Sequence, residues 1–138
     1  MSRIQLALNV DDLDAAIAFY SKLFGVAPAK VKPGYANFAI ADPPLKLVLL
    51  EGDGSGGTLN HLGVEVESSD QVHAEIARLT GEGLFTEEQI GTTCCFALQD
   101  KVWVEAPDGE RWEVYTKLAD SETFFEPPAV EAGGGCCG

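Results

Sequence analysis

The chain has 138 residues, 46% of them hydrophobic, which is enough for one globular domain with a buried core. Its 22 acidic residues outnumber nine scattered lysines and arginines, and the formal net charge is −13. We therefore expect no nucleic-acid partner, because phosphate binding needs a concentrated basic surface. No apolar run approaches the roughly 20 residues that span a bilayer, and the N-terminus does not resemble a signal peptide. These features predict a cytoplasmic protein with no membrane partner.

The first half of the sequence predicts one strand, one helix and three further strands. Ile4 to Val10 alternates apolar and other residues, as a half-buried strand does. The acidic pair Asp11-Asp12 then favours a helix start, and Gly25 favours its end, so a helix is expected over Leu13–Phe24. Turns rich in proline and glycine separate three short strand-like runs at 26–32, 35–41 and 45–51.

The second half repeats this order at an offset of about 56 residues. An alternating strand over 60–66 leads through Ser68-Ser69-Asp70 into a helix expected over 71–82, which glycines 81 and 83 end. Strand-like runs follow at 84–90, 95–99, 102–106 and 111–116. The pattern predicts an α+β fold of two tandem βαβββ modules, residues 1–51 and 58–118, in one domain over 1–118. Residues 119–138 lose periodicity and predict a flexible tail.

The segment that joins the two halves, residues 52–57, matches the G-x-G-x-x-G spacing of dinucleotide-binding loops. Such a loop needs a helix directly after it, because the helix N-terminus holds the pyrophosphate. A strand is predicted there instead. The segment is therefore interpreted as a flexible linker.

Three polar side chains lie opposite the apolar faces of their predicted strands. Gln5 alternates with Leu6 and Leu8, His61 alternates with Leu62, and Glu113 lies between Trp112 and Val114. A strand face opposite the core is polar by default, so alternation alone is weak support for a site. Imidazole, carboxylate and an amide oxygen nevertheless suit Fe(II), Mn(II) or a similar ion. With two histidines in the chain, His61 and His73, any site that needs three is excluded. His73 is interpreted as a solvated helix residue.

The four cysteines form two adjacent pairs, Cys94-Cys95 and Cys136-Cys137. A bridge between neighbours would be strained and would constrain almost no chain entropy, so both pairs are predicted to be free dithiols in a reducing cytosol. Each pair is either a soft-ion site or a pair without function, and Cys94-Cys95 could also be two small buried residues. Adjacent strand residues point to opposite faces, so chelation by both sulfurs requires a loop or bulge over 91–95, which we expect to be mobile.

Two segments resemble signatures of the vicinal-oxygen-chelate superfamily. They are Gln5-x4-Val10-x-Asp12-Leu13-x2-Ala16-x2-Phe19-Tyr20-x2-Leu23-Phe24-Gly25 and Pro107-Asp108-Gly109-x2-Trp112-Glu113-Val114-Tyr115. The resemblance covers residues 3–117. It implies a glyoxalase-like cup of two βαβββ modules, with metal ligands from the first and last strands of the modules. By position these ligands are Gln5, His61 and Glu113. The strand at 45–50 lacks the mid-strand carboxylate of glyoxalase I-like members, which favours three ligands and open positions.

Two departures from the general pattern are similar to the ArsI-type organoarsenical lyases. Gln5 stands where many members have histidine, and Cys94-Cys95 lies in the second module. This resemblance implies an Fe(II)- and O2-dependent dioxygenase that cleaves the carbon–arsenic bond of methylarsenite and trivalent aromatic arsenicals. Cys94 and Cys95 would hold the arsenic, and other divalent metals could replace iron. Cys136 and Cys137 are possible accessory thiols, and Phe96, Trp103 and Tyr115 could line the organic side of the site.

Alternative functions remain open at this point. One is a different metal-dependent enzyme on the same scaffold, such as a fosfomycin-modifying transferase or an extradiol dioxygenase. Another is a protein that binds arsenic or cadmium, or sequesters a drug as bleomycin resistance proteins do, without turnover. Because both modules are present, a monomer suffices, although modules are exchanged between chains in this superfamily and a homodimer is equally compatible.

Overall fold

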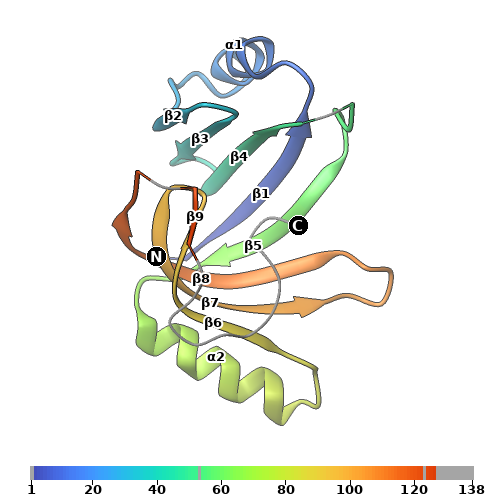
Figure 1. Ribbon diagram of the computed structural model, residues 1–138, viewed down its shortest axis with the longest axis vertical. Coiled ribbons are helices and arrows are strands. Elements are labelled where there is room, and N and C mark those ends of the chain that lie inside the picture. Colours follow the sequence, from blue (N-terminus) through green and yellow to red (C-terminus); the bar gives the residue numbers. More distant parts are fainter. Residues whose placement is uncertain (1, 53, 123, 127–138) are drawn as a thin grey trace. The chain divides into compact units, whose positions relative to one another are not determined.

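The computed structural model describes residues 2–122 except 53, together with 124–126. It divides into two compact units, one over Arg3–Leu62 and one that begins at Gly63 and also includes Ser2. Each unit contains one helix and several strands, as two βαβββ modules require (Figure 1). Among the described residues, no helix is long and apolar enough to cross a membrane.

The Arg3–Leu62 unit contains β1, one helix and three further strands. The elements are β1 (Arg3–Val10), α1 (Leu13–Phe24), β2 (Lys30–Lys32), β3 (Tyr35–Ile40), β4 (Leu45–Glu51) and the first residues of β5 (Leu59–Glu65). The strand order is β2-β3-β4-β1-β5. Strands β2, β3 and β4 pair antiparallel, whereas β1 and β4 are parallel because α1 crosses between their ends.

Helix α1 has the bounds that the sequence predicts, and its ends show why. The side chain of Asp12 accepts a hydrogen bond from the backbone N–H of Ala15 at 3.0 Å. Glu51, at the end of β4, accepts another from the N–H of Leu13 at 2.8 Å. At the other end Gly25 adopts a left-handed backbone with φ of 69° and donates to the carbonyl of Ser21. Both helix ends thus have partners for backbone groups that a helix leaves unpaired.

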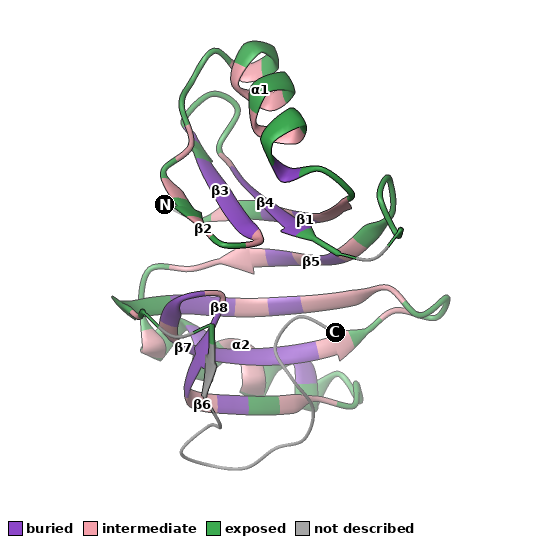
Figure 2. Ribbon diagram, turned by 45° about the horizontal axis from the view of Figure 1, so that its top comes forward, coloured by how far each residue is buried: buried purple, intermediate pink, exposed green. Residues whose placement is uncertain are grey.

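The core of this unit lies between α1 and one face of its sheet. Figure 2 shows buried residues concentrated on β3 and β4 (Figure 2). The alternation predicted for β1 is confirmed for Leu6, Leu8 and Val10, which pack against this core, whereas Ile4 is 45% exposed. The buried members of the core are Leu13, Ala36, Phe38, Ile40, Leu47 and Leu49. Residues that alternate with these face away from α1.

The second unit contains the end of β5, a helix and four strands. These are α2 (Ser69–Gly81), β6 (Glu87–Cys94), β7 (Ala97–Glu105), β8 (Arg111–Asp120) and β9 (Phe125–Glu126), with antiparallel order β8-β7-β6-β9. The hydroxyl of Ser68 caps α2 by accepting from the N–H of Gln71 at 3.3 Å. A pocket of about 580 Å³ is lined by Trp112, Val114 and residues of α2, so these two residues face the helix as predicted.

Several predicted bounds are wrong. The runs at 95–99 and 102–106 form one strand, β7, because Asp100 and Lys101 between them are buried and paired and do not form a turn. Strand β2 keeps three residues of the predicted 26–32, and β6 runs to Cys94 although 84–90 was predicted. Helix α2 ends before Glu82, whose φ of −82° is not left-handed. Strand β8 continues to Asp120 and β9 follows at 125–126, while residues 127–138 of the expected tail lie outside the described residues.

Candidate functional site

Gln5 and His61 lie side by side on the sheet face that points away from α1. Gln5 comes from β1 and His61 from β5, and their side chains are 4% and 3% exposed. The amide Nε2 of Gln5 is 3.2 Å from the imidazole Nε2 of His61. An amide nitrogen carries hydrogens and no lone pair to accept with, so Gln5 donates and His61 Nε2 accepts. The structure thus brings together two of the three ligands predicted from the sequence.

The other ring nitrogen of His61 contacts the neighbouring residue. Nδ1 of His61 is 2.7 Å from the side-chain oxygen of Asn60. This oxygen accepts the hydrogen of Nδ1, which leaves the lone pair of the neutral ring on Nε2. An imidazole in this form can bind a metal through Nε2.

Lys46 occupies the position on β4 that pairs with Gln5. The parallel register of β1 and β4 places Gln5 opposite Lys46, and Lys46 is 9% exposed. The prediction that this strand has no mid-strand carboxylate is confirmed, because the one carboxylate of β4, Glu51, ends the strand and caps α1. A cationic side chain at this position is not a metal ligand, which leaves the first unit with the amide and imidazole donors.

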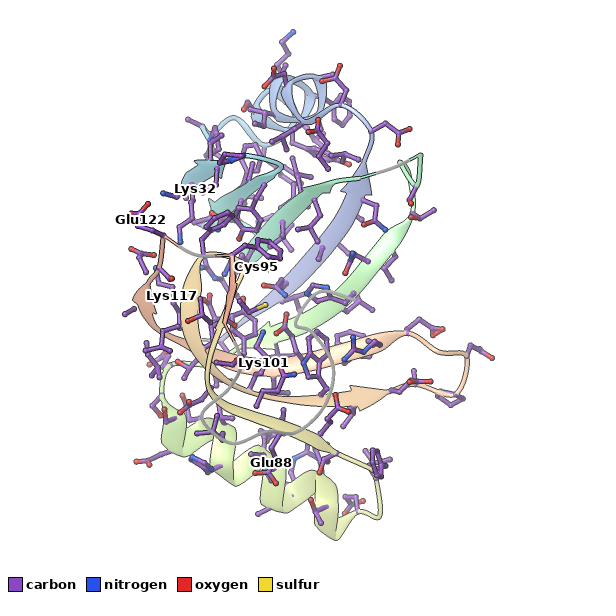
Figure 3. The ribbon with its side chains drawn as sticks, viewed as in Figure 1. Lys32, Glu88, Cys95, Lys101, Lys117 and Glu122 are labelled. Atoms are coloured by element: carbon purple, nitrogen blue, oxygen red, sulfur yellow. The ribbon has the colours of Figure 1, made fainter. Side chains whose placement is uncertain are left out.

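Glu113 forms a buried ion pair in the second unit. The ammonium Nζ of Lys101 on β7 is 2.7 Å from Oε1 of Glu113 on β8, with side-chain exposures of 1% and 4%. The antiparallel register places Trp103 directly opposite Glu113, and Lys101 opposite Tyr115. Figure 3 labels Lys101 among the side chains of these strands (Figure 3). Because both charges are removed from water, each depends on the other for compensation.

Aromatic rings surround the Lys101 ammonium. Its Nζ lies 5.4 Å from the ring centroid of Trp103 and 5.8 Å from that of Tyr115. The guanidinium of Arg111 lies 4.1 Å from the Trp103 ring, and the indole N–H donates to Gln89 at 3.3 Å. Trp103 and Tyr115 are 2% and 1% exposed. These rings therefore help to stabilise a buried cation, a role that the sequence did not reveal.

Cys94 and Cys95 lie at the tight turn between β6 and β7, where Figure 3 labels Cys95. Cys94 is the last residue of β6 and pairs with Ala97, so Cys95 and Phe96 form a two-residue hairpin loop. Both loop residues have left-handed backbones, with φ of 51° and 62°, as a type I′ turn requires. The two sulfur atoms are 3.6 Å apart. The two sulfurs thus lie close enough to contact one atom, as chelation by both cysteines requires.

The prediction of a loop or bulge over 91–95 is correct at its ends and wrong in the middle. The β6–β7 register shifts between Gln89 and Thr92, and Gly91 has φ of +66°. Regular pairing then resumes through Thr92, Thr93 and Cys94 before the chain turns. Because the turn begins directly after Cys94, the side chains of Cys94 and Cys95 escape the opposite orientations of a regular strand.

The prediction of free thiols holds for Cys95 and is wrong for Cys94. Cys95 is half-buried and is not part of a disulfide. Cys94 is 1% exposed and is disulfide-bonded, though not to Cys95. The argument from strain applies to a bond between adjacent cysteines and does not constrain pairing with a distant one. A site made of two thiols is therefore a property of the reduced protein.

Gln5, His61 and Glu113 carry amide, imidazole and carboxylate groups, which are donor types that divalent transition metals accept. Two of them are oxygen or nitrogen donors buried on one face of the first unit, and the third is a buried carboxylate that already compensates a positive charge. Among the described residues, no group of three or more His, Cys, Asp and Glu side chains is placed to hold a metal ion. Gln5 is a glutamine, so a group made only of His, Cys, Asp and Glu cannot contain all three predicted ligands, Gln5, His61 and Glu113.

The remaining predicted residues have different outcomes. His73 is exposed on α2, as predicted. Phe96 is 8% exposed and packs edge-on against Phe124, with ring centroids 5.4 Å apart. Cys136 and Cys137 lie outside the described residues. Sequence reasoning missed Asn60 and Lys101. Asn60 directly precedes the predicted histidine ligand, and Lys101 follows Asp100 at a position that the sequence presents as a polar turn.

Comparisons with known proteins identify the superfamily of the chain. Residues 3–114 match the Glyoxalase/Bleomycin resistance protein/Dioxygenase superfamily. The chain is 79% identical over 128 residues to the cadmium-induced protein CadI of Mycobacterium tuberculosis (strain ATCC 25618 / H37Rv), covering 93% of this chain and 84% of that protein. It is 63% identical over 125 residues to the trivalent organoarsenical cleaving enzyme of Thermomonospora curvata, with coverage of 90% and 83%.

A solved structure shows the same fold at lower identity. The 2,3-dioxygenase LapB from Pseudomonas sp. KL28 gives a TM-score of 0.65 at 22% identity, covering 91% of this chain and 46% of that chain. The protein thus spans less than half the length of that dioxygenase. The superfamily resemblance and the α+β fold predicted from the sequence are confirmed. The chain belongs to the Glyoxalase/Bleomycin resistance protein/Dioxygenase superfamily, and it has relatives named for cadmium induction and for trivalent organoarsenical cleavage.

Proposed function

We propose that the protein is an Fe(II)- and O2-dependent lyase that cleaves the carbon–arsenic bond of trivalent organoarsenicals, such as methylarsenite and trivalent aromatic arsenicals. Dioxygen is the oxidant, and the products are arsenite and an oxidised organic fragment. The observation that carries the proposal is the cysteine turn, where two sulfurs lie 3.6 Å apart in a chain 63% identical to a named organoarsenical cleaving enzyme. Thiols are soft ligands, and trivalent arsenic is a soft electrophile that two of them can chelate.

Substrate capture would use both thiols of the reduced protein. Cys94 and Cys95 each lose a proton and form one arsenic–sulfur bond, while the two hydroxyl groups of a trivalent arsenical leave as two molecules of water. No electrons are transferred in this exchange. The third arsenic bond, to carbon, remains intact and points away from the sulfurs. The proposal places the organic group against one or more of the aromatic side chains of Phe96, Trp103 and Tyr115.

Metal binding would use Gln5, His61 and Glu113. Gln5 now presents its amide nitrogen to His61, so its side-chain amide must turn to present the oxygen as a ligand. Glu113 must exchange or share its Lys101 partner. Ferrous iron, when bound, supplies the redox chemistry that allows dioxygen to react with an organic substrate. The burial of all three side chains limits access of water to the site.

The test follows arsenic through the reaction. Purified protein is reduced, loaded with Fe(II) and incubated with methylarsenite with and without oxygen, and the arsenic species are separated and quantified. Oxygen-dependent release of arsenite is expected. The Cys94→Ser protein should lose arsenical binding but keep metal binding, and His61→Ala should do the reverse. The double variant Cys136→Ser/Cys137→Ser is the matched control and should keep both. Normal turnover by Cys94→Ser would refute the dithiol site.

A second candidate function is binding without turnover. The identity of 79% to a cadmium-induced protein favours it, because the same thiols bind soft cations such as Cd²⁺. In that case methylarsenite or Cd²⁺ would bind stoichiometrically to the reduced protein. No arsenite would form from methylarsenite, with Fe(II) and oxygen present or absent. The same arsenic measurement therefore separates the two functions.

A further inference from the structure

A chain of side-chain hydrogen bonds leads from His61 to the surface of the Arg3–Leu62 unit. Nδ1 of His61 contacts Oδ1 of Asn60 at 2.7 Å, and Nδ2 of Asn60 donates to Oδ1 of Asn9 at 2.9 Å. Nδ2 of Asn9 then donates to Oγ1 of Thr58 at 2.9 Å, and this hydroxyl donates to the backbone carbonyl of Ser55 at 2.6 Å. We call these four bonds, from His61 through Asn60, Asn9 and Thr58 to Ser55, the His61 relay.

The outer end of the relay fixes the direction of every bond in it. A backbone carbonyl can only accept, so the Thr58 hydroxyl must donate its one hydrogen to Ser55. Towards Asn9 the same hydroxyl can then only accept, which requires Asn9 to present its amide nitrogen. The oxygen of Asn9 consequently faces Asn60 and requires the amide nitrogen of that residue. The remaining atom of the Asn60 amide, its oxygen, faces His61 and accepts from Nδ1–H.

The backbone holds this outer end in place. The N–H of Asn9 donates to the carbonyl of Thr58 at 2.9 Å, and the N–H of Gly57 donates to the carbonyl of Asn9 at 3.0 Å. Thr58 is exposed, Asn60 and Asn9 are half-buried, and His61 is buried. The relay therefore connects an anchored, solvent-exposed turn, which begins at Ser55 in the predicted linker between the two modules, to a buried imidazole. The second neighbour of the His61 ring, Gln5, requires the same position of the ring hydrogen. Gln5 donates a hydrogen bond to Nε2 of His61, so the lone pair of the ring must lie on Nε2.

We propose that Asn60, Asn9 and Thr58 are positioning residues that place the hydrogen of the neutral His61 ring on Nδ1 and its lone pair on Nε2. The inference rests on the proposed function in one respect, that His61 binds the metal through Nε2. A histidine ligand needs its second nitrogen held by a partner that fixes both the hydrogen position and the ring orientation. The relay supplies this partner and sets its polarity from a backbone carbonyl four bonds away.

The test measures the hydrogen position directly in the metal-free, reduced protein. With ¹⁵N-labelled histidine, His61 and His73 are the two imidazoles observed, and His73→Gln assigns them. At a pH where the ring is neutral, the wild-type His61 should show a pyrrole-type Nδ1 and a pyridine-type Nε2. Asn60→Leu should shift His61 towards the other tautomer. Asn60→Asp keeps an accepting oxygen and should retain the wild-type pattern at alkaline pH. An unchanged pattern in Asn60→Leu overturns the proposal.

The exposed end of the relay provides a matched pair of variants. Thr58→Ser keeps the hydroxyl and should leave His61 unchanged. Thr58→Val removes it, frees the amide of Asn9 to reverse, and should shift the His61 tautomer in the same direction as Asn60→Leu, although by less. If Thr58→Val matches the wild type while Asn60→Leu does not, Asn60 acts alone and the relay is refuted.

Metal affinity gives the second readout. Titration with Co(II) should show binding about 10- to 100-fold weaker for Asn60→Leu than for the wild type. Asn60→Asp and Thr58→Ser should remain close to the wild type. Wild-type affinity in Asn60→Leu, together with an altered tautomer, would overturn the link to metal binding. Neither readout uses an arsenical. Failure of the protein to cleave methylarsenite would therefore not contradict this inference, and successful cleavage would not establish it.

Discussion

The pairing of Lys101 with Glu113 explains how a carboxylate predicted to bind a metal is tolerated in a buried position. An isolated carboxylate in this environment would be strongly unfavourable. The Lys101 ammonium compensates it at 2.7 Å, and the faces of Trp103 and Tyr115 stabilise the ammonium in turn. Lys101 thus supplies the positive charge that compensates Glu113.

Removing the ammonium alone should destabilise the metal-free protein. In Lys101→Met the Glu113 carboxylate stays buried without compensation, and breaking such a pair costs about 3–5 kcal/mol. Urea denaturation of the metal-free variant measures this loss. The double variant Lys101→Met/Glu113→Leu removes both charges and should recover most of it. Lys117→Met is the matched control, because its pair with Asp120 is exposed and should contribute less than about 1 kcal/mol. A loss for Lys101→Met no larger than that of this control would contradict the argument.

Residues of the candidate site differ in how visible they are in the sequence. Alternation shows that Gln5, His61 and Glu113 each lie opposite the apolar face of their own strand, because side chains alternate with a period of two. The same rule cannot identify Lys101 as the partner of Glu113, since the pair depends on the register of β7 against β8. The relay through Asn60 and Asn9 joins residues 51 apart and is equally invisible to a local pattern.

At the scale of elements, the cysteine turn combines tight geometry with unusual residues. Type I′ loops favour asparagine and glycine, because both central residues need positive φ. Here Cys95 and Phe96 occupy those positions. A left-handed backbone costs an ordinary residue roughly 1–2 kcal/mol. This cost is offset in part by the packing of Phe96 on Phe124 and by the hydrogen bond from Gln99 to the carbonyl of Cys94 at 2.8 Å.

Relieving the turn should stabilise the protein and abolish arsenical binding. Asparagine tolerates the left-handed region, so Cys95→Asn should raise the free energy of unfolding by about 1 kcal/mol. Cys95→Ser is the control, because it also removes the thiol but has no comparable preference for positive φ. Both variants should lose methylarsenite binding in titrations of the reduced protein. Equal stability of the two variants would show that the turn stores no strain at Cys95.

The elements with clear local signals were predicted best. Helix α1 and strand β4 have the predicted bounds, because Asp12 and Gly25 mark the helix ends and the proline-rich turn at 42–44 marks the start of β4. Strand β7 was divided in two, since Asp100 and Lys101 resemble a polar turn. Asp100 instead accepts hydrogen bonds from the N–H of Gly91 and the hydroxyl of Ser69, at 2.8 and 2.6 Å. Tertiary partners thus override the local preference of polar residues for turns.

At the scale of the whole molecule, the candidate ligands are divided between the two compact units. Gln5 and His61 belong to the unit over Arg3–Leu62, and Glu113 belongs to the unit that begins at Gly63. Both tryptophans of the chain, Trp103 and Trp112, also lie in the second unit. Tryptophan fluorescence therefore reports unfolding of the unit that contains Glu113 and neither Gln5 nor His61.

This division makes the proposed ligand set testable by linkage. A ligand that binds only the folded state at 100 times its Kd stabilises that state by about 2.7 kcal/mol. Co(II) at such a concentration should therefore shift the urea midpoint seen by tryptophan fluorescence, and a chelator should reverse the shift. His61→Ala should abolish the shift although His61 lies in the other unit. Glu113→Gln should abolish the Co(II)-induced shift as well. The double variant His61→Ala/Glu113→Gln should behave like either single variant, because one ion needs both residues. A full shift in His61→Ala would mean that the metal binds without the first unit, and the three-ligand set would then be wrong.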